Sequence, residues 1–287
     1  AREQGMKVLL SGAGGDDLFS GYRRHLAVGF DRYWGWLPKQ LLSGSALAVS
    51  RLDQRRAFVR KLTKLLSGAA LPIEDRMVSY FLWAAEPELF ALYRPEFRTH
   101  LNSGAAKAPM MAFMALLPKT LTSLERMLML EQRFFLADHN LTYTDKMSMA
   151  VGVEVRVPFL DLDLVSHAAS IPAGMKQKGF TGKWILKKTM EPYLPHDLIY
   201  RPKTGFGAPL RRWMIHELRP LLLDFLSEES LKRRGIFDPK AVHRLIRDNH
   251  GGKVDAAYTL LALLSIEIWC RAYIDAAPTS SSCMGCT

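Results

Sequence analysis

The sequence contains few cysteines, and their positions do not favour a secreted, disulfide-bonded protein. Only 3 of its 287 residues are cysteine, too few for a disulfide framework, so we expect a reducing, cytoplasmic setting. Cys283 and Cys286 have CxxC spacing, but no second pair accompanies them, and we interpret them as part of a tail and not as a zinc site. Cys270 lies in an apolar stretch, where we expect it to be buried.

Long apolar runs are also scarce. The longest, residues 256–272, contains Glu267 and Arg271 and falls short of a clean membrane span. We therefore predict a buried closing helix and no membrane partner. No signal peptide, internal repeat or extended low-complexity segment is visible.

Acidic residues are in the minority. The chain has 28 Asp and Glu against 39 Lys and Arg, a net charge of +11. The basic residues are scattered over predicted helices, so nucleic acid is not the expected partner. A solvated basic surface and a site for ATP, pyrophosphate and acidic substrates both remain open. With 48% hydrophobic residues the chain is globular, and we assign residues 1–275 to one region and 276–287 to a flexible tail.

Strand signals are few, and the predicted fold is mainly α-helical. Residues 7–10 form a short apolar run before a Gly-rich turn. Gly152 can end a helix that runs into Ala150, and the alternating valines of residues 153–157 predict extended chain up to a break at Pro158. Elsewhere Pro and Gly divide the chain into helices.

Two helical predictions concern packing. Residues 55–66 predict an amphipathic surface helix whose apolar face includes Phe58 and Leu62. Residues 105–115 contain Pro109 and several Met residues, and predict a mobile, lid-like connection or, alternatively, core packing of the Met side chains. Residues 121–150 predict one or two good helices.

Polar residues in two segments are candidates for a site. In an extended segment Glu154 and Arg156 point to the same side, either as a positioned pair beside a cleft or as a structural salt bridge. The small residues 11–15 allow backbone N–H groups to approach a phosphate or an acyl-adenylate, although a tight strand–helix turn would look alike. Asp16 and Asp17 could hold Mg²⁺ or cap a helix.

Four motifs occur in order, and together they are highly specific. They are Leu-Leu-Ser-Gly-Ala-Gly-Gly-Asp-Asp-Leu-Phe-Ser-Gly-Tyr at 9–22, the stretch 145–161 that ends Glu-Val-Arg-Val-Pro-Phe-Leu-Asp, Gly-Lys-Trp-Ile-Leu-Lys-Lys at 182–188, and Arg-Pro-Lys-Thr-Gly-Phe-Gly at 201–207. This set resembles the synthetase domain of the glutamine-dependent asparagine synthetase family. β-Lactam synthetases and lasso-peptide cyclases share much of it. The resemblance is clear over residues 5–213.

The resemblance implies a fold and a reaction. The chain would be the C-terminal part of an α/β adenine-nucleotide-hydrolase-like (PP-loop) synthetase domain, mainly α with a short β remnant. The family adenylates the side-chain carboxylate of aspartate with ATP, releases pyrophosphate, and lets ammonia from a glutaminase domain attack the adenylate. ATP and Mg²⁺ are the implied cofactors. The implied partners are an acidic small molecule such as aspartate, the upstream glutaminase and phosphate-loop portion, and a second copy in a homodimer.

The resemblance also assigns residues. Lys183 takes the role of catalytic cation and Asp16 that of metal ligand. The nucleotide-binding candidates are Ser11, Gly12, Ala13, Gly14, Gly15 and Lys203. The substrate-binding or positioning candidates are Asp17, Asp145, Glu154, Arg156 and Arg201.

Two departures qualify these expectations. The family's Ser-Gly-Gly-x-Asp-Ser motif is expected upstream of Gly5 and is not in the chain, and residue 1 is Ala and not the glutaminase Cys, so we expect the isolated chain to be inactive. Ala13 stands where many members have an acidic or aromatic residue, and a methyl group cannot accept a proton. The substrate could therefore be another acid, such as a sugar acid or peptide. A non-catalytic basic helical interaction module is the alternative.

Overall fold

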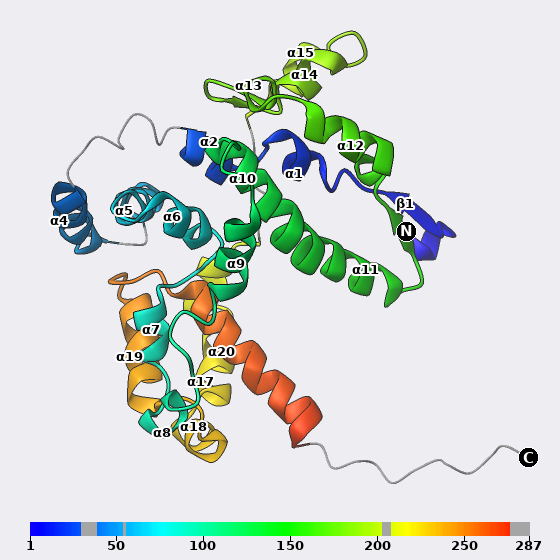
Figure 1. The fold of residues 1–287 in the computed structure, drawn as a ribbon. Helices are drawn as coiled ribbons and strands as arrows, with labels where there is room; N and C mark the ends of the chain where they lie inside the picture. Colours follow the sequence, from blue (N-terminus) through cyan, green and yellow to red (C-terminus); the bar gives the residue numbers. More distant parts are fainter. Residues whose placement is uncertain (30–38, 54–55, 203–207, 276–287) are drawn as a thin grey trace, which may run out of the picture. The chain divides into compact units, whose positions relative to one another are not determined.

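The computed structural model describes residues 1–29, 39–53, 56–202 and 208–275. The chain forms two compact units. Unit 1 comprises Ala1–Lys39, Leu71–Phe81 and Ala106–Thr204, and unit 2 comprises Gln40–Ala70, Leu82–Ala105 and Gly205–Thr287. Both are built mainly from helices (Figure 1), which confirms the expectation of a mainly helical chain with little strand.

Unit 1 contains all the described strands as well as helices. Its elements are η1 (Arg2–Gln4), β1 (Val8–Leu10), α1 (Gly15–Phe19), α2 (Arg23–Gly29), α6 (Ile73–Ser79), α9 (Ala108–Leu116), α10 (Ser123–Leu130), η2 (Glu131–Leu141), α11 (Thr142–Met149), β2 (Glu154–Arg156), η3 (Pro158–Leu160), α12 (Leu162–Ser170), α13 (Ala173–Lys176), β3 (Gln177–Lys178), β4 (Thr181–Gly182), α14 (Trp184–Met190) and α15 (His196–Ile199).

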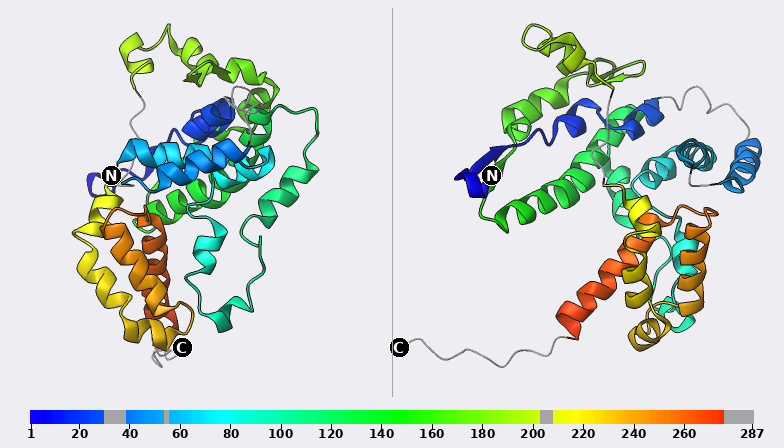
Figure 2. Two further views of the ribbon diagram at one scale, coloured as in Figure 1. Left: turned by 90° about the vertical axis from the view of Figure 1, so that its left-hand side faces the viewer. Right: turned by 180° about the vertical axis from the view of Figure 1, so that it is seen from behind.

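The described part of unit 2 is helical, and its last helices lie side by side in Figure 2. Its elements are α4 (Lys39–Ser50), α5 (Ala57–Ala69), α7 (Glu86–Phe90), α8 (Pro95–Arg98), α16 (Leu210–Ile215), α17 (Arg219–Phe225), α18 (Glu228–Arg234), α19 (Pro239–His250), α20 (Ala257–Trp269) and η4 (Cys270–Ile274).

The two strands predicted from the sequence pair with each other. β1 and β2 are parallel, with Leu9 opposite Val155, and the helix before β2 ends at Met149 as expected. The strand β1 is not covered: Leu10 is 75% exposed, and Val8 and Leu9 are exposed too. A parallel sheet normally has both faces covered, and a two-stranded sheet is marginally stable alone. This pair therefore depends on additional contacts.

Three clusters of buried apolar side chains form the cores of the two units, each cluster within one unit. In unit 2, residues such as Leu222 and Leu260 join α16, α17, α19 and α20. In unit 1 a first core gathers Met77, Met114 and Met127 from α6, α9 and α10. A second, smaller core in unit 1 joins α1, η3, α12 and α14 and is described below, because it positions the candidate site.

A long helical segment crosses unit 1. It passes from α10 through η2 into α11, and η2 has π-helical hydrogen bonding. A capping box between Thr122 and Glu125 begins it: the Thr122 Oγ1 accepts from the Glu125 N–H, and the Glu125 carboxylate accepts from the Thr122 N–H at 2.7 Å. Such caps stabilise a helix by about 1 kcal/mol. π-Helical turns are frequent at functional sites, and the residues of η2 prove to face the candidate site.

Some packing predictions were wrong and others are confirmed. The helix predicted at 55–66 is present as α5, but Phe58 is 74% exposed and does not join an apolar face. Residues 108–116 form α9, so the lid-like connection is wrong, and the alternative of core packing is confirmed, since Met114 is buried and Met110 packs against the same core. Pro109 is tolerated because it lies in the first turn, where its missing N–H has no partner to lose. Cys270 is buried as expected. The predicted tail, 276–287, lies outside the described residues.

Within the described residues, Ala257–Ile274 is long and apolar enough to cross a membrane by length and composition. Leu260, Leu263 and Leu264 of this stretch are buried in the core of unit 2. Ile266, Ile268 and Trp269 are exposed, so core packing accounts for only part of the apolar character, and the prediction of a buried closing helix is confirmed only in part. The stretch is weak evidence of a membrane span.

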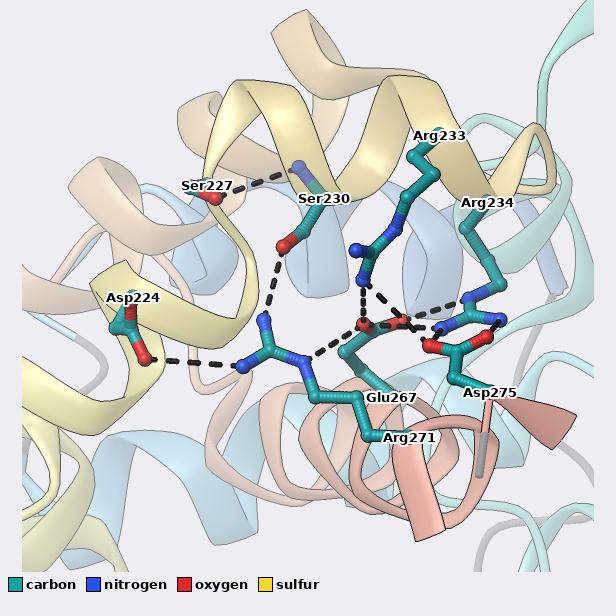
Figure 3. A network of polar contacts seen from close by, with 8 residues as sticks. All are labelled: Asp224, Ser227, Ser230, Arg233, Arg234, Glu267, Arg271 and Asp275. Atoms are coloured by element: carbon teal, nitrogen blue, oxygen red, sulfur yellow. Dashed lines mark hydrogen bonds and ion pairs between the residues drawn. The ribbon is translucent and has the colours of Figure 1, made fainter. Parts of the chain in front are cut away.

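Charged residues fasten the end of this helix to α18 (Figure 3). The Glu267 carboxylate is nearly buried and accepts hydrogen bonds from Arg234 and from Arg271 Nε at 3.0 Å. Arg234 also bonds Asp275 at 2.7 Å, and Arg271 donates to Ser230 Oγ at 2.9 Å. Burial opposes ionisation of Glu267, but the two arginines outweigh it and hold the pKa of the carboxyl below its usual range.

We expect Glu267→Ala to destabilise the protein by about 2–3 kcal/mol, because it leaves the half-buried Arg234 and Arg271 without a shared carboxylate. Urea denaturation, followed by circular dichroism, measures the loss. Glu229→Ala, which removes an exposed acid from α18, is the control and should change stability by less than about 0.5 kcal/mol. Equal losses in the two variants would contradict the assigned role.

Candidate functional site

The Gly-rich loop between β1 and α1 lies against the Pro-Phe-Leu-Asp segment. The Ser11 N–H donates to the Arg156 carbonyl at 2.8 Å, which fastens the loop to the end of β2. Gly14 has φ +89°, and a methyl group there would lie 2.5 Å from Leu160 Cδ2. Gly is required at this position for both reasons. The first and second motifs, distant in the sequence, thus meet in one place.

The small core of unit 1 fixes the helices around this loop. Leu18 and Phe19 of α1 and Ala168 of α12 are buried. Phe159 meets the Phe19 ring edge-on, with ring centroids 6.4 Å apart. Asp161 caps α12 by accepting from the Asp163 N–H at 3.0 Å. Aromatic and capping contacts of this kind each stabilise the fold by about 1 kcal/mol. They fix α1 and α12, and with them the end of the loop that leads into α1.

The third motif joins this site through Lys183. Its Nζ lies 3.0 Å from Asp16 Oδ1, and the two side chains are 32% and 27% exposed. The Lys183 N–H donates to the Phe19 carbonyl at 3.0 Å. The ammonium group of Lys183 is therefore held beside the loop by its backbone as well as by its charge.

Two strained residues meet at this junction. Ser20 has φ +63° and Lys183 has φ +54°, the two non-glycine residues with positive φ in the described chain. A methyl group at Gly182 would clash with the Ser20 carbonyl oxygen, so the two backbone segments touch. Strain of about 1–3 kcal/mol per residue persists only where the surroundings enforce it, and it concentrates at functional sites.

A buried cluster of charge lies next to α1. Glu131, the first residue of η2, is fully buried, as is His25. Arg24 donates to both Glu131 oxygens, from Nε at 2.7 Å and also from a terminal nitrogen. His25 Nδ1 accepts from the Tyr22 N–H at 3.4 Å, so Nε2 carries the proton and donates to Glu131 at 3.1 Å. Burial lowers the pKa of His25 against the opposing effect of Glu131, which keeps the imidazole neutral.

Aromatic rings enclose the guanidinium of Arg24. Its carbon lies 4.2 Å from the ring centre of Phe135 and 4.6 Å from that of Tyr22. The Tyr22 hydroxyl accepts a hydrogen bond of 3.2 Å from Asn140 of η2. Cation–π contacts of desolvated arginine are worth about 2 kcal/mol. The π-helical segment is thereby tied to the end of the first motif.

Asp17 is buried beside this cluster. It is 1% exposed, and its Oδ1 has no hydrogen-bond partner among the described residues. Burial, and then the nearby charge of Glu131, raise the pKa of Asp17 to about 6. This burial favours a role for Asp17 in positioning α1 over direct contact with a substrate.

The other sequence-predicted residues are placed differently. Glu154 and Arg156 point to the same side and pair at 2.7 Å, but their side chains are 55% and 63% exposed, which fits a surface salt bridge. Asp145 and Arg201 are exposed, and no hydrogen bond or ion pair within the described chain joins either to Asp16 or Lys183. Lys203 lies outside the described residues.

The site does not by itself build a metal centre. No group of three His, Cys, Asp or Glu side chains within the described residues could hold a metal ion. Asp16 offers one carboxylate, which Lys183 contacts. Mg²⁺ usually takes one or two carboxylates and completes its coordination with water and substrate phosphates. Asp16 thus fits a single ligand of a phosphate-bound ion.

Sequence reasoning missed Arg24, His25 and Glu131. Glu131 carried a signal, because it stands three residues after Leu128 and four before Phe135, on the apolar side of a predicted helix. A carboxylate on such a face needs a buried partner. Nothing local identified Arg24 and His25 as that partner.

Comparisons with known proteins agree with the motif analysis. The family model for asparagine synthase matches residues 1–271. A putative glutamine-hydrolysing asparagine synthetase of Mycobacterium tuberculosis is 29% identical over 94% of this chain and 40% of its own length. Asparagine synthetase 1 of Bacillus subtilis is 27% identical over 91% of this chain and 40% of its own length. The chain thus spans about two fifths of these relatives, and no solved structure matches it.

We expect Gly182→Ala to destabilise the protein by about 2 kcal/mol or more, because the new methyl group meets backbone that cannot move without displacing Lys183. Chemical denaturation measures the effect. Gly174→Ala, in α13 of the same unit, is the matched control, since an added methyl there meets nothing within 4 Å. A Gly182→Ala protein as stable as the control variant would show that the two segments are not docked as described.

Asp17 makes stability depend on pH. Its pKa is about 6 in the fold against 3.8 for an unperturbed Asp side chain. From about pH 4 to pH 7 the unfolded chain therefore loses this proton first, and the fold loses stability. We expect the free energy of unfolding of Asp17→Asn to rise by about 1–3 kcal/mol relative to the parent between pH 4 and pH 7. Urea denaturation at pH 4, 5.5 and 7 measures it, with Asp163→Asn reporting the loss of one exposed charge. A difference that does not change with pH would refute the buried position of Asp17.

Proposed function

Because the chain belongs to the asparagine synthase family, we propose that it is part of an ATP-dependent, amide-forming ligase. In this proposal ATP adenylates a substrate carboxylate, pyrophosphate leaves, and ammonia derived from glutamine displaces AMP. Aspartate is the proposed acid and asparagine the product. The observation that supports it best is the Lys183–Asp16 pair beside the Gly-rich loop.

Each part of the site has a role in this reaction. In the loop at residues 11–15 the N–H groups of Ser11, Ala13 and Gly15 already donate within the protein. The N–H groups of Gly12 and Gly14 are therefore the ones that we propose to bind phosphate oxygens. Lys183 supplies a fixed positive charge near the α-phosphate of ATP, where negative charge develops as the substrate carboxylate attacks it. Asp16 holds the ammonium in place before the nucleotide binds. Mg²⁺, with Asp16 as one ligand, would neutralise phosphate charge when bound.

The uncovered strands support a larger domain. The β1–β2 pair has exposed apolar side chains on β1, whereas parallel sheets are covered on both faces. We propose that the pair continues a PP-loop sheet whose other strands come from an upstream portion of the same polypeptide. That portion would also contribute the missing phosphate loop and a glutaminase. A homodimer and a cytoplasmic location also remain predictions.

The identity of the acid is a separate question. Ala13 offers a methyl group where an acidic side chain would help ammonia to attack. A sugar acid or a peptide carboxylate is therefore a second candidate substrate within the same reaction. ATP–pyrophosphate exchange with a panel of acids distinguishes them, because exchange requires the correct carboxylate and no amine.

We expect Lys183→Ala and Lys183→Arg each to lower exchange at least about a hundredfold, a loss of roughly 2.7–4 kcal/mol of transition-state stabilisation. Arginine should fail because its planar fork does not replace a compact ammonium. The measurement uses a polypeptide in which this chain is joined to an upstream phosphate-loop portion.

Lys187→Ala and Lys188→Ala are the controls for this prediction. Lys187 lies over the Tyr200 ring and Lys188 pairs with Glu191, so both should retain most activity. Similar losses for all three lysines, or near-normal exchange by Lys183→Ala, would refute the proposed site. A non-catalytic basic module would show no exchange with any acid.

A further inference from the structure

Unit 2 contains a cavity that the proposed reaction does not use. Its volume is about 590 Å³, within the usual range for a small-molecule site. It opens between α17 and α19, and the start of α18 contributes to its wall. Its lining residues are Arg219, Leu223, Ser227, Glu228, His243, Ile246, Arg247, His250 and Gly251.

The charges around this cavity are mostly basic and are available to a ligand. Arg219 and Arg247 are exposed, and no described carboxylate pairs with either of them. The one acid of the lining, Glu228, is engaged by Lys232 at 2.6 Å. The cavity thus presents two free guanidinium groups on different helices, and each can bind a carboxylate or phosphate through two parallel hydrogen bonds.

The remaining walls are apolar or polar without charge. Ile246 is buried and Leu223 is 43% exposed, and both line the cavity. His243 Nε2 donates to the Leu226 carbonyl at 2.9 Å, which fixes the ring and leaves Nδ1 for a ligand. A lining that combines apolar side chains with cationic groups suits a ligand with an apolar body and an anionic group.

We propose that this cavity binds a small organic anion, a phosphate or carboxylate group attached to an apolar body. The two arginines hold the anionic group, and Leu223 and Ile246 contact the body. The inference is independent of the proposed ligase reaction, since its residues belong to unit 2 and the Lys183 site belongs to unit 1.

Isothermal titration calorimetry of the 287-residue chain tests the proposal with defined probes. Phenyl phosphate and benzoate carry an apolar body, inorganic phosphate does not, and benzyl alcohol lacks the charge. We expect phenyl phosphate or benzoate to bind more tightly than inorganic phosphate, and benzyl alcohol not to bind. The stronger of the first two identifies the anionic group. The proposal would be overturned if neither phenyl phosphate nor benzoate bound at 10 mM, or if inorganic phosphate bound as tightly as the better of the two.

Matched variants separate the cavity from the general basic surface. The double variant Arg219→Gln/Arg247→Gln should bind the better probe about tenfold more weakly or worse. Lys240→Gln/Arg244→Gln removes two exposed charges from α19 outside the cavity and should bind normally. Leu223→Ser should weaken phenyl phosphate but not inorganic phosphate. Equal losses in the two double variants would mean that binding is non-specific, and melting temperatures confirm that each variant is folded.

Discussion

The hydrogen bond from the Lys183 N–H to the Phe19 carbonyl joins two segments that are far apart in the sequence. It brings the C-terminal turn of α1 against Lys183, the residue that precedes α14, and Ser20 and Lys183 both adopt left-handed backbone geometry there. A lysine in that geometry pays a conformational penalty that the surrounding contacts must exceed. The close approach of Gly182 to Ser20 and the apolar core under α1 supply those contacts. The position of the ammonium group beside Asp16 follows from this backbone arrangement.

Charge balance inside unit 1 is the second constraint. Glu131 is fully buried, and Arg24 and His25 satisfy it, while Asp17 nearby has an unsatisfied oxygen and a raised pKa. Glu131 is thus stabilised in its ionised form, whereas burial favours the protonated form of Asp17. Asp17 belongs to α1, the same helix that carries Asp16, so the buried network lies directly beside the candidate site.

Local structure was predictable where neighbouring residues alone determine the backbone conformation. Gly152, the alternating valines and Pro158 predicted the end of α11 and the strand β2, and both are present. The pattern of α5 was recognised, but Phe58 was assigned to the wrong side because periodicity does not say which face meets the protein. Of the two alternatives for residues 105–115, core packing of Met side chains is confirmed, whereas a lid-like connection is not, because Pro109 stands in the first turn of α9 and does not break it.

Long-range pairing explains the remaining differences. The contact of Asp16 with Lys183, and of Arg24 with Glu131, depends on segments that no local pattern connects. Family resemblance supplied Lys183 and Asp16, since their motifs are distinctive, but it supplied no partner for Glu131. The same limitation applies to the strand β1, whose sequence predicts burial while its side chains are exposed.

That exposure bears directly on the loop. The loop at residues 11–15 is held at one end by the core under α1 and at the other by the Ser11–Arg156 backbone bond at the edge of a two-stranded sheet. A sheet of this size has little stability of its own. The end of the loop that leads into α1 is therefore fixed better than the end at Ser11. Electrostatic catalysis requires donors that are already in position before charge develops. In the proposed reaction, the loop N–H groups would therefore gain most from further strands beside β1 and β2, whereas the backbone bond to Phe19 already holds Lys183 next to the loop.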